Sequence, residues 1–452
     1  MLPRARRSAR FKVKPSYDSA NNVLNAPFHN AQFVTIQDLP VELVSLIISY
    51  IQGDKRRATL KSCSCLSHTW RGLTLPHVFA SVEVPVEQLV GFATFVKSKS
   101  HIAALIKSLT IFCDRPSYNK KPMSFARNSS FNRILARLPA VEYLRCSFLL
   151  FSPSRASPAL DSKLSARFKL RRFVWDKCVI DDAWGCNREA QFLRILSVVS
   201  LFDADTLDLI LPWTDGLWPH KHISLAQPLA FKSVVVRGIS SSAFLSCFCQ
   251  NLSPDTLRFL TVSIAQPHHV AELGQLLHRV GRNLEHLRIN FRNMTQLQWW
   301  TGPVLAELKL DSCPRLTTLN VTMLWGLLPD AGYISGFALA RILAQAPASL
   351  REIRIPIFLS QPVRRQPSAV IDAVKLPAVE RILTQPAFPS IRAFVFEFTK
   401  KENIELYRTL LEDMFPALRQ RGVLYVEYLD HEPIDECLDV VKACSATTDR
   451  HK

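Results

Sequence analysis

Residues 284–290, LEHLRIN, contain the pattern that decides the fold of this 452-residue chain. Apolar residues occupy the first, fourth and sixth positions, and the same spacing recurs in LRFLTVS (257–263) and LTTLNVT (316–322). Side chains alternate between the two faces of a strand, so the fourth and sixth residues share a face and the residue between them points the other way. Each copy is therefore predicted to be a short strand with one buried face.

Looser copies of this phrase run along most of the chain. They are IKSLTIF (106–112), VEYLRCS (141–147), LRRFVWD (170–176), TLDLIL (206–211), FKSVVVR (231–237), LAELKLD (305–311), LREIRIP (350–356), IRAFVFE (391–397) and RGVLYVEY (421–428). The copy at 305–311 is the weakest, because its middle apolar residue stands only 11 positions before that of the next copy.

Segments with helical periodicity separate the copies, at 131–139, 188–199, 268–281, 337–347 and 406–418. Strand–helix units that recur along a chain bury their apolar faces against one another. The pattern predicts an α/β fold, a curved solenoid over residues 85–430 that is similar to leucine-rich repeats. Separate α/β domains with a doubly wound sheet are the alternative.

The segment DLPVELVSLIISYIQ, residues 38–52, predicts a helix with almost no polar face. Its polar side chains form one narrow stripe of Glu42, Ser45, Ser49 and Gln52. A helix that is apolar nearly all round is normally buried on more than one side. This helix therefore needs two burying surfaces.

The motifs around this helix resemble an F-box of the form common in fungal proteins. LP-x-EL-x-x-x-II (39–48) is followed by TLKSC (59–63), LSHTWR (66–71) and LPHVF (75–79), and the resemblance covers residues 36–84. It implies a three-helix module that docks onto a Skp-type adaptor of a cullin-based ubiquitin ligase. The adaptor-contacting residues carried over by position are Leu39, Pro40, Leu43, Ile47, Leu66 and Trp70. An N-terminal helical subdomain buried on the solenoid is the alternative.

The resemblance implies a substrate receptor, which links the adaptor to a protein target and is not itself an enzyme. Only 13 glycines occur and none forms G-x-G, which excludes a Rossmann turn and a P-loop. No cysteine or histidine spacing suits zinc, so we expect no metal and no cofactor. No apolar run is long enough for a membrane span. Eleven cysteines without a secretory signal predict free, mostly buried thiols and a cytoplasmic or nuclear protein.

A net charge of +18 favours acidic partners. Six basic residues precede the first acid, and residues 1–35 and 431–452 are expected to be tails, the first of them disordered. The alternative function is a basic repeat protein that binds nucleic acid through phosphate contacts, or a non-catalytic scaffold. Against nucleic acid, aromatic residues do not alternate with Arg and Lys as a base-stacking platform requires.

The outward position between the two apolar residues of each strand suggests a target site. In the later copies this position holds Thr261, Arg288, Lys309, Asn320 and Arg354. Arg288, Lys309 and Arg354 would form a basic strip for an acidic or phosphorylated target, since Arg binds carboxylates and phosphates in a forked geometry. The alternative is a solvated surface without a ligand.

Overall fold

The structure is a computed structural model of the whole chain. It describes residues 39–51, 56–113, 123–124, 130–152, 168–180, 195–196, 198–211, 225, 227–238, 242–291, 303–325, 331–359, 377–386, 388–398 and 404–429. The two tails expected from the sequence, 1–35 and 431–452, lie outside these residues. The chain divides into two compact units, Met1–Thr74 and Leu75–Lys452, which are described separately.

Helices make up the described part of the first unit: α1 (Val41–Tyr50), α2 (Arg56–Cys63) and the start of α3 (His68–Phe79). Pro40 precedes α1, and its carbonyl oxygen accepts hydrogen bonds from the N–H groups of Leu43 (3.0 Å) and Val44 (3.1 Å). Ser67 precedes α3, and its hydroxyl accepts a hydrogen bond from the N–H of Trp70 at 3.2 Å, as an N-cap serine does. Local sequence thus accounts for where two of these helices start.

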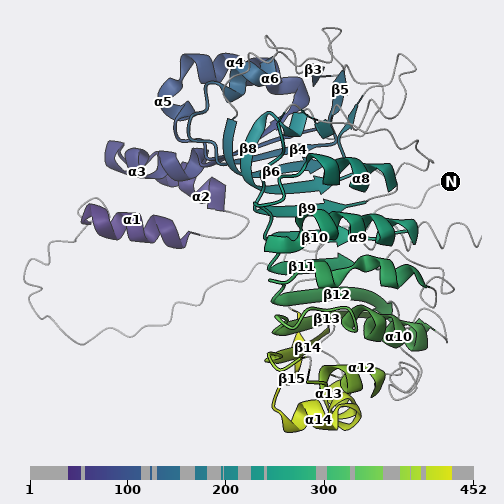
Figure 1. The fold of residues 1–452 in the computed structure, drawn as a ribbon. Coiled ribbons are helices and arrows are strands. Elements are labelled where there is room, and N and C mark those ends of the chain that lie inside the picture. Colours follow the sequence, from purple (N-terminus) through teal and green to yellow (C-terminus); the bar gives the residue numbers. More distant parts are fainter. Residues whose placement is uncertain are drawn as a thin grey trace, which may run out of the picture. The chain divides into compact units, whose positions relative to one another are not determined.

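A twelve-stranded parallel sheet forms the second unit (Figure 1). Each strand hydrogen-bonds to the strand of this sheet that comes next along the chain, without the reversal of strand order that a doubly wound sheet requires. The strands are β1 (Ser81–Pro85), β2 (Ser108–Phe112), β4 (Tyr143–Ser147), β6 (Phe168–Asp176), β8 (Phe202–Ile210), β9 (Ser233–Arg237), β10 (Phe259–Ser263), β11 (His286–Asn290), β12 (Thr318–Trp325), β13 (Glu352–Leu359), β14 (Ala393–Phe398) and β15 (Leu424–Tyr428). This solenoid-like order confirms an α/β fold with a parallel sheet.

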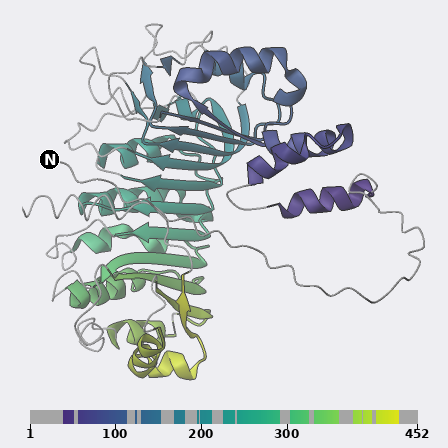
Figure 2. The same cartoon turned by 180° about the vertical axis from the view of Figure 1, so that it is seen from behind.

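Two further groups of elements accompany the large sheet. Very short strands β3 (Met123–Ser124), β5 (Leu150–Ser152) and β7 (Val179–Ile180) form a separate parallel sheet. The helices are α4 (Leu89–Ser98), α5 (Ser100–Ala103), α6 (Ser130–Leu135), α8 (Ser242–Asn251), α9 (His268–Val280), α10 (Ala331–Leu343), α12 (Pro377–Leu383), α13 (Ile404–Met414) and α14 (Pro416–Gln420), with 3₁₀ turns η2 (Val86–Gln88) and η3 (Gly281–Asn283). Helices α8, α9 and α10 lie on the same side of the sheet in both views (Figures 1 and 2).

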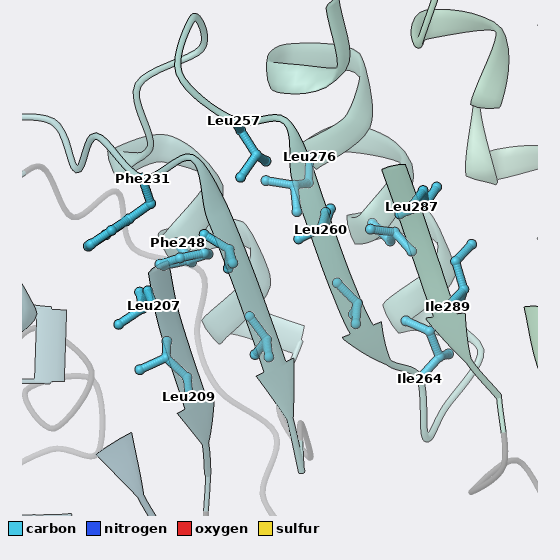
Figure 3. Packing of buried hydrophobic residues seen from close by; sticks show 14 of the residues in the cluster. Leu207, Leu209, Phe231, Phe248, Leu257, Leu260, Ile264, Leu276, Leu287 and Ile289 are labelled. Carbon is cyan, nitrogen blue, oxygen red and sulfur yellow. The ribbon is translucent and has the colours of Figure 1, made fainter. Parts of the chain in front are cut away.

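The strand register explains the repeated phrase. Leu260 pairs with Leu287, which pairs with Leu319, and all three are buried. The column extends from β2 to β14, because the equivalent residues Leu109, Leu144, Phe173, Leu207, Val234, Ile353 and Phe394 are paired and buried in the same way. Figure 3 shows part of this core, with Leu260 and Leu287 on neighbouring strands and Leu276 of α9 beside Leu260. The apolar positions of the phrase form the core, as predicted.

One copy of the phrase was predicted wrongly. Residues 305–311 do not form a strand but two 3₁₀ helices, η5 (Pro303–Leu308) and η6 (Leu310–Ser312). Leu305 and Leu308 are both buried, and their spacing of three residues is one turn of a 3₁₀ helix as well as the start of the phrase. The side chain of Gln345 stabilises the junction of η5 and η6. It accepts a hydrogen bond from the Lys309 N–H (3.2 Å) and donates one to the Leu305 carbonyl (2.8 Å).

A buried histidine in α9 is expected to make the fold sensitive to acid. His269 is fully buried, and neither ring nitrogen has a hydrogen-bond partner among the described residues. Burial, with a smaller contribution from the charge of His268, lowers the pKa of His269 from 6.5 to about 3. The folded state therefore holds His269 neutral between these two values, whereas the unfolded state binds a proton there.

The free energy of unfolding is thus expected to decrease as the pH falls below 6.5, because the unfolded state binds a proton at His269 and the folded state does not. At pH 4.5 the loss attributable to His269 is about 2–3 kcal/mol relative to neutral pH. His269→Leu should reduce the acid sensitivity by that amount in urea unfolding at pH 7 and pH 4.5. An identical pH dependence in the variant and the wild type would contradict this assignment.

Candidate protein-interaction surfaces

Helix α1 has one buried face and one exposed apolar face. Val44 and Ile48, one turn apart, are buried, with exposed fractions of 3% and 0%. On the rest of the helix Val41, Leu43, Leu46, Ile47 and Tyr50 are all exposed, and they are called the α1 surface below. The exposed fractions of Leu43 and Ile47 are 47% and 42%. The sequence requires two burying surfaces for this helix, and within the described residues only one of them is present.

The α1 surface concentrates exposed apolar area in a small unit. Of the twelve large apolar side chains exposed in the described residues, six lie in the first unit, the five of the α1 surface and Leu66. Soluble proteins rarely expose contiguous apolar patches, and such patches mark sites where other molecules bind. The α1 surface and Leu66 are therefore the strongest candidates for a protein–protein contact.

The six residues that the F-box resemblance implicated do not share one environment. Pro40, Leu43, Ile47 and Leu66 are exposed, and Leu39 is half-buried. Trp70 is only 2% exposed, so its indole belongs to the interior of the unit with Leu60 and not to the exposed surface. The sequence did not assign Val41, Leu46 and Tyr50 to the adaptor contact, although the helical periodicity of residues 41–50 places them on the non-buried faces of α1.

The predicted basic strip on the sheet is not present. Arg288 of β11 does point outward, in register with Thr261 and Asn320, as predicted. Lys309 is absent from the sheet, because it connects η5 and η6 with a left-handed φ of 53°. Without Lys309 the strip has no cation between the strands of Arg288 and Arg354.

Arg354 is surrounded by carboxylates. Its guanidinium pairs with Glu352, with Glu397 (2.6 Å) and with Glu427 (3.2 Å). Partial burial disfavours its charge, but the hydrogen bonds to Glu397 and Glu352 outweigh this and raise the pKa of Arg354 above its usual value. Three acids around one cation make this place unsuitable for an acidic or phosphorylated ligand.

Neighbouring strands elsewhere in the sheet repeat the same kind of pairing. Arg145 of β4 binds Asp176 of β6 at 2.5 Å, and Arg172 of β6 binds Asp208 of β8 at 2.8 Å. Both carboxylates are buried. Each of these pairs neutralises one cation of the outward face, and the arginine compensates the charge of the buried acid. In the sequence Asp176 follows the buried pair Phe173 and Trp175, whereas Asp208 stands between the buried residues Leu207 and Leu209.

Most of the described cysteines are buried thiols. All eight described cysteines are free, and six of them are buried, which agrees with the sequence prediction for this part of the chain. Burial raises the pKa of Cys247 and Cys249 to about 11 and, with the charge of Asp311 as a smaller cause, that of Cys313 to about 12. Among the described residues there is no group of three or more His, Cys, Asp or Glu placed to hold a metal ion.

Comparisons with known proteins add no family to these observations. No family model matches the chain, and no curated protein matches it. In the part of the chain that the structure describes, no helix is both long and apolar enough to cross a membrane.

Proposed function

We propose that the chain is the substrate-recognition subunit of a cullin-based ubiquitin ligase and that it has no catalytic role of its own. The first unit would act as the F-box that binds a Skp-type adaptor, and the second, as a leucine-rich-repeat-like solenoid, would bind the protein target. The observation that carries the proposal is the α1 surface, where apolar side chains are exposed on a helix whose opposite face is buried. The resemblance of the motifs in residues 39–79 to an F-box suggests the identity of the partner.

The physical argument for this partner is that water is a poor environment for the α1 surface. Each buried Leu or Ile side chain contributes about 1.5–3 kcal/mol relative to the exposed state. Four or five such side chains on one helix match the helix-in-groove mode of recognition, in which residues about one turn apart anchor an apolar helix in its partner. A surface of this kind requires no metal, nucleotide or catalytic residue.

Nucleic-acid binding is the weaker candidate. Cations on the sheet, such as Arg145, Arg172 and Arg354, already pair with carboxylates, and the pairing reduces the charge available for phosphates. If the chain did bind nucleic acid, its affinity would decrease steeply with salt. Adaptor binding through apolar side chains would depend little on salt, so a salt titration of both interactions separates the two proposals.

Cysteine labelling offers an independent test. Cys65 is exposed and adjoins Leu66, whereas the thiols in the second unit's core are buried. We expect a Skp-type adaptor to slow the alkylation of Cys65 by about tenfold or more, since bound protein excludes reagent from thiols in or beside an interface. Peptide-level mass spectrometry would follow Cys65, with Cys313 as an internal control that stays unlabelled with or without adaptor. Unchanged labelling of Cys65 in a stable complex would exclude the α2–α3 turn from the interface.

A further inference from the structure

A shallow pocket of about 360 Å³ lies on the outward face of the first strands of the sheet. Its charged lining comes from three strands: Glu83 of β1, Arg145 of β4 and Asp176 of β6. Phe112 and Phe148 provide aromatic walls, the first at the end of β2 and the second directly after β4. This volume is at the lower end of ligand pockets, so it suits one long side chain better than a folded surface.

The charges of the pocket favour a cation. Asp176 is buried and accepts hydrogen bonds from Arg145 (2.5 Å) and from the hydroxyl of Ser147 (3.1 Å). Arg145 is therefore already neutralised, and the neighbouring carboxylate would repel an added anion. Glu83 is exposed and forms no ion pair with a described residue. The residues that line the pocket thus include two carboxylates and one guanidinium, and the ammonium of Lys177 lies beside them at the Phe148 ring.

Phe148, one of the two aromatic walls, has a strained backbone conformation. Phe148 has a φ of 54°, in the left-handed region that bulky residues rarely adopt, and the residue is 39% exposed. A hydrogen bond from its N–H to the Asp176 carbonyl, 2.9 Å long, fixes this conformation. Strain of this kind concentrates at binding sites. The ring also attracts positive charge, since the ammonium of Lys177 lies 5.7 Å from its centroid.

We propose that this pocket binds the side chain of a lysine or arginine that an extended peptide presents to the sheet. The cation lies near the Glu83 carboxylate, and its aliphatic stem packs against Phe112 and Phe148. The sequence predicted an acidic target, whereas this pocket would bind a basic one. Only the assignment of the peptide to a ubiquitination target rests on the proposed function. Binding of the peptide itself is independent of the adaptor.

The test uses the full chain and three short fluorescent peptides that differ only in one central residue, Arg, Lys or Glu. We expect the Arg and Lys peptides to bind at millimolar or tighter concentration and the Glu peptide not to bind, measured by fluorescence anisotropy. Glu83→Gln and Phe148→Leu should each weaken binding of the Arg peptide by about threefold to fivefold, since one exposed ion pair or cation–π contact contributes that much.

Asp205→Asn is the matched control, because Asp205 is an exposed acid of β8 that pairs with Lys232 and does not line the pocket. It should leave peptide affinity unchanged. Three results would each overturn the proposal. The Glu peptide binds more tightly than the Arg peptide, no peptide binds to the wild type, or the affinity for the Arg peptide is the same in the wild type and both pocket variants. Adaptor co-purification should be the same for wild type and Glu83→Gln, so a failure here is distinguishable from a failure of the proposed function.

The peptide is assigned to a target protein, and the chain's own arginine-rich N-terminus is the other source that must be tested. A full-length variant with Arg4, Arg6, Arg7 and Arg10 replaced by serine separates them. Tighter binding of the Arg peptide to this variant would identify the N-terminus as a competitor for the pocket. Unchanged binding would assign the pocket to another protein.

Discussion

Replacing Leu43 or Ile47 with aspartate is expected to abolish co-purification of a Skp-type adaptor with this chain. Both side chains belong to the α1 surface and lie more than two-fifths exposed in the unbound chain. In the complex an aspartate there would be buried against apolar groups without a partner, at a cost of about 3 kcal/mol or more. That cost corresponds to a decrease in affinity of about a hundredfold or more.

The experiment needs a control for the effect of adding a charge to an exposed apolar position. Val90→Asp is suitable, because Val90 is a 69% exposed apolar residue on α4 in the second unit. It should leave the adaptor complex intact. Circular dichroism and thermal unfolding would establish that all three variants are folded. If folded Leu43→Asp and Ile47→Asp proteins still capture the adaptor as the wild type does, the α1 surface is not the docking site.

The strands were predicted correctly and the basic strip was predicted wrongly, and both results have the same physical origin. In LEHLRIN the period of two fixes which residues face the core, and Leu287 and Ile289 are buried while Arg288 points outward. Strand periodicity gives the direction of a side chain but not its neighbours. The acids around Arg354 come from β13, β14 and β15, and Glu397 stands 43 residues away in the sequence.

Strands of two or three residues carried too little information for a prediction. The strands β3, β5 and β7 have only two or three residues each, so no alternation can be read from them. The segment 305–311 failed for a different reason, since a three-residue spacing of leucines fits a strand phrase and a 3₁₀ turn equally well. For α1 the sequence revealed two apolar faces, but only the folded structure decides that Val44 and Ile48 form the buried one.

The second large effect is expected for Gly274→Ala, a change that local helix propensity alone would favour. Gly274 lies in the middle of α9, where alanine is preferred to glycine by about 1 kcal/mol. However, a Cβ atom at this position would lie 1.7 Å from the backbone carbonyl oxygen of Glu307 in η5. Backbone cannot rotate away as a side chain does, so α9 and η5 would have to separate.

Gly91→Ala is the matched control for this substitution. Gly91 is also a helical glycine, in α4, but a Cβ atom there would meet no heavy atom within 4 Å. Because there is no steric penalty, only the higher helix propensity of alanine acts, and Gly91→Ala should stabilise the chain by about 0.5–1 kcal/mol. The two variants make the same chemical change, so their difference isolates packing.

Gly274→Ala should destabilise the protein by about 2–3 kcal/mol, the cost of overpacking a tightly packed core, measured as a lower urea midpoint for unfolding. The penalty arises because Leu305 and Leu308 are buried and the backbone of η5 therefore lies against α9. If residues 303–308 formed a strand of the sheet, their backbone would not lie there. Gly274→Ala thus tests the 3₁₀ structure of residues 303–308 directly. Equal stabilisation by Gly274→Ala and Gly91→Ala would mean that α9 does not pack on η5, and the segment 305–311 could then be a strand after all.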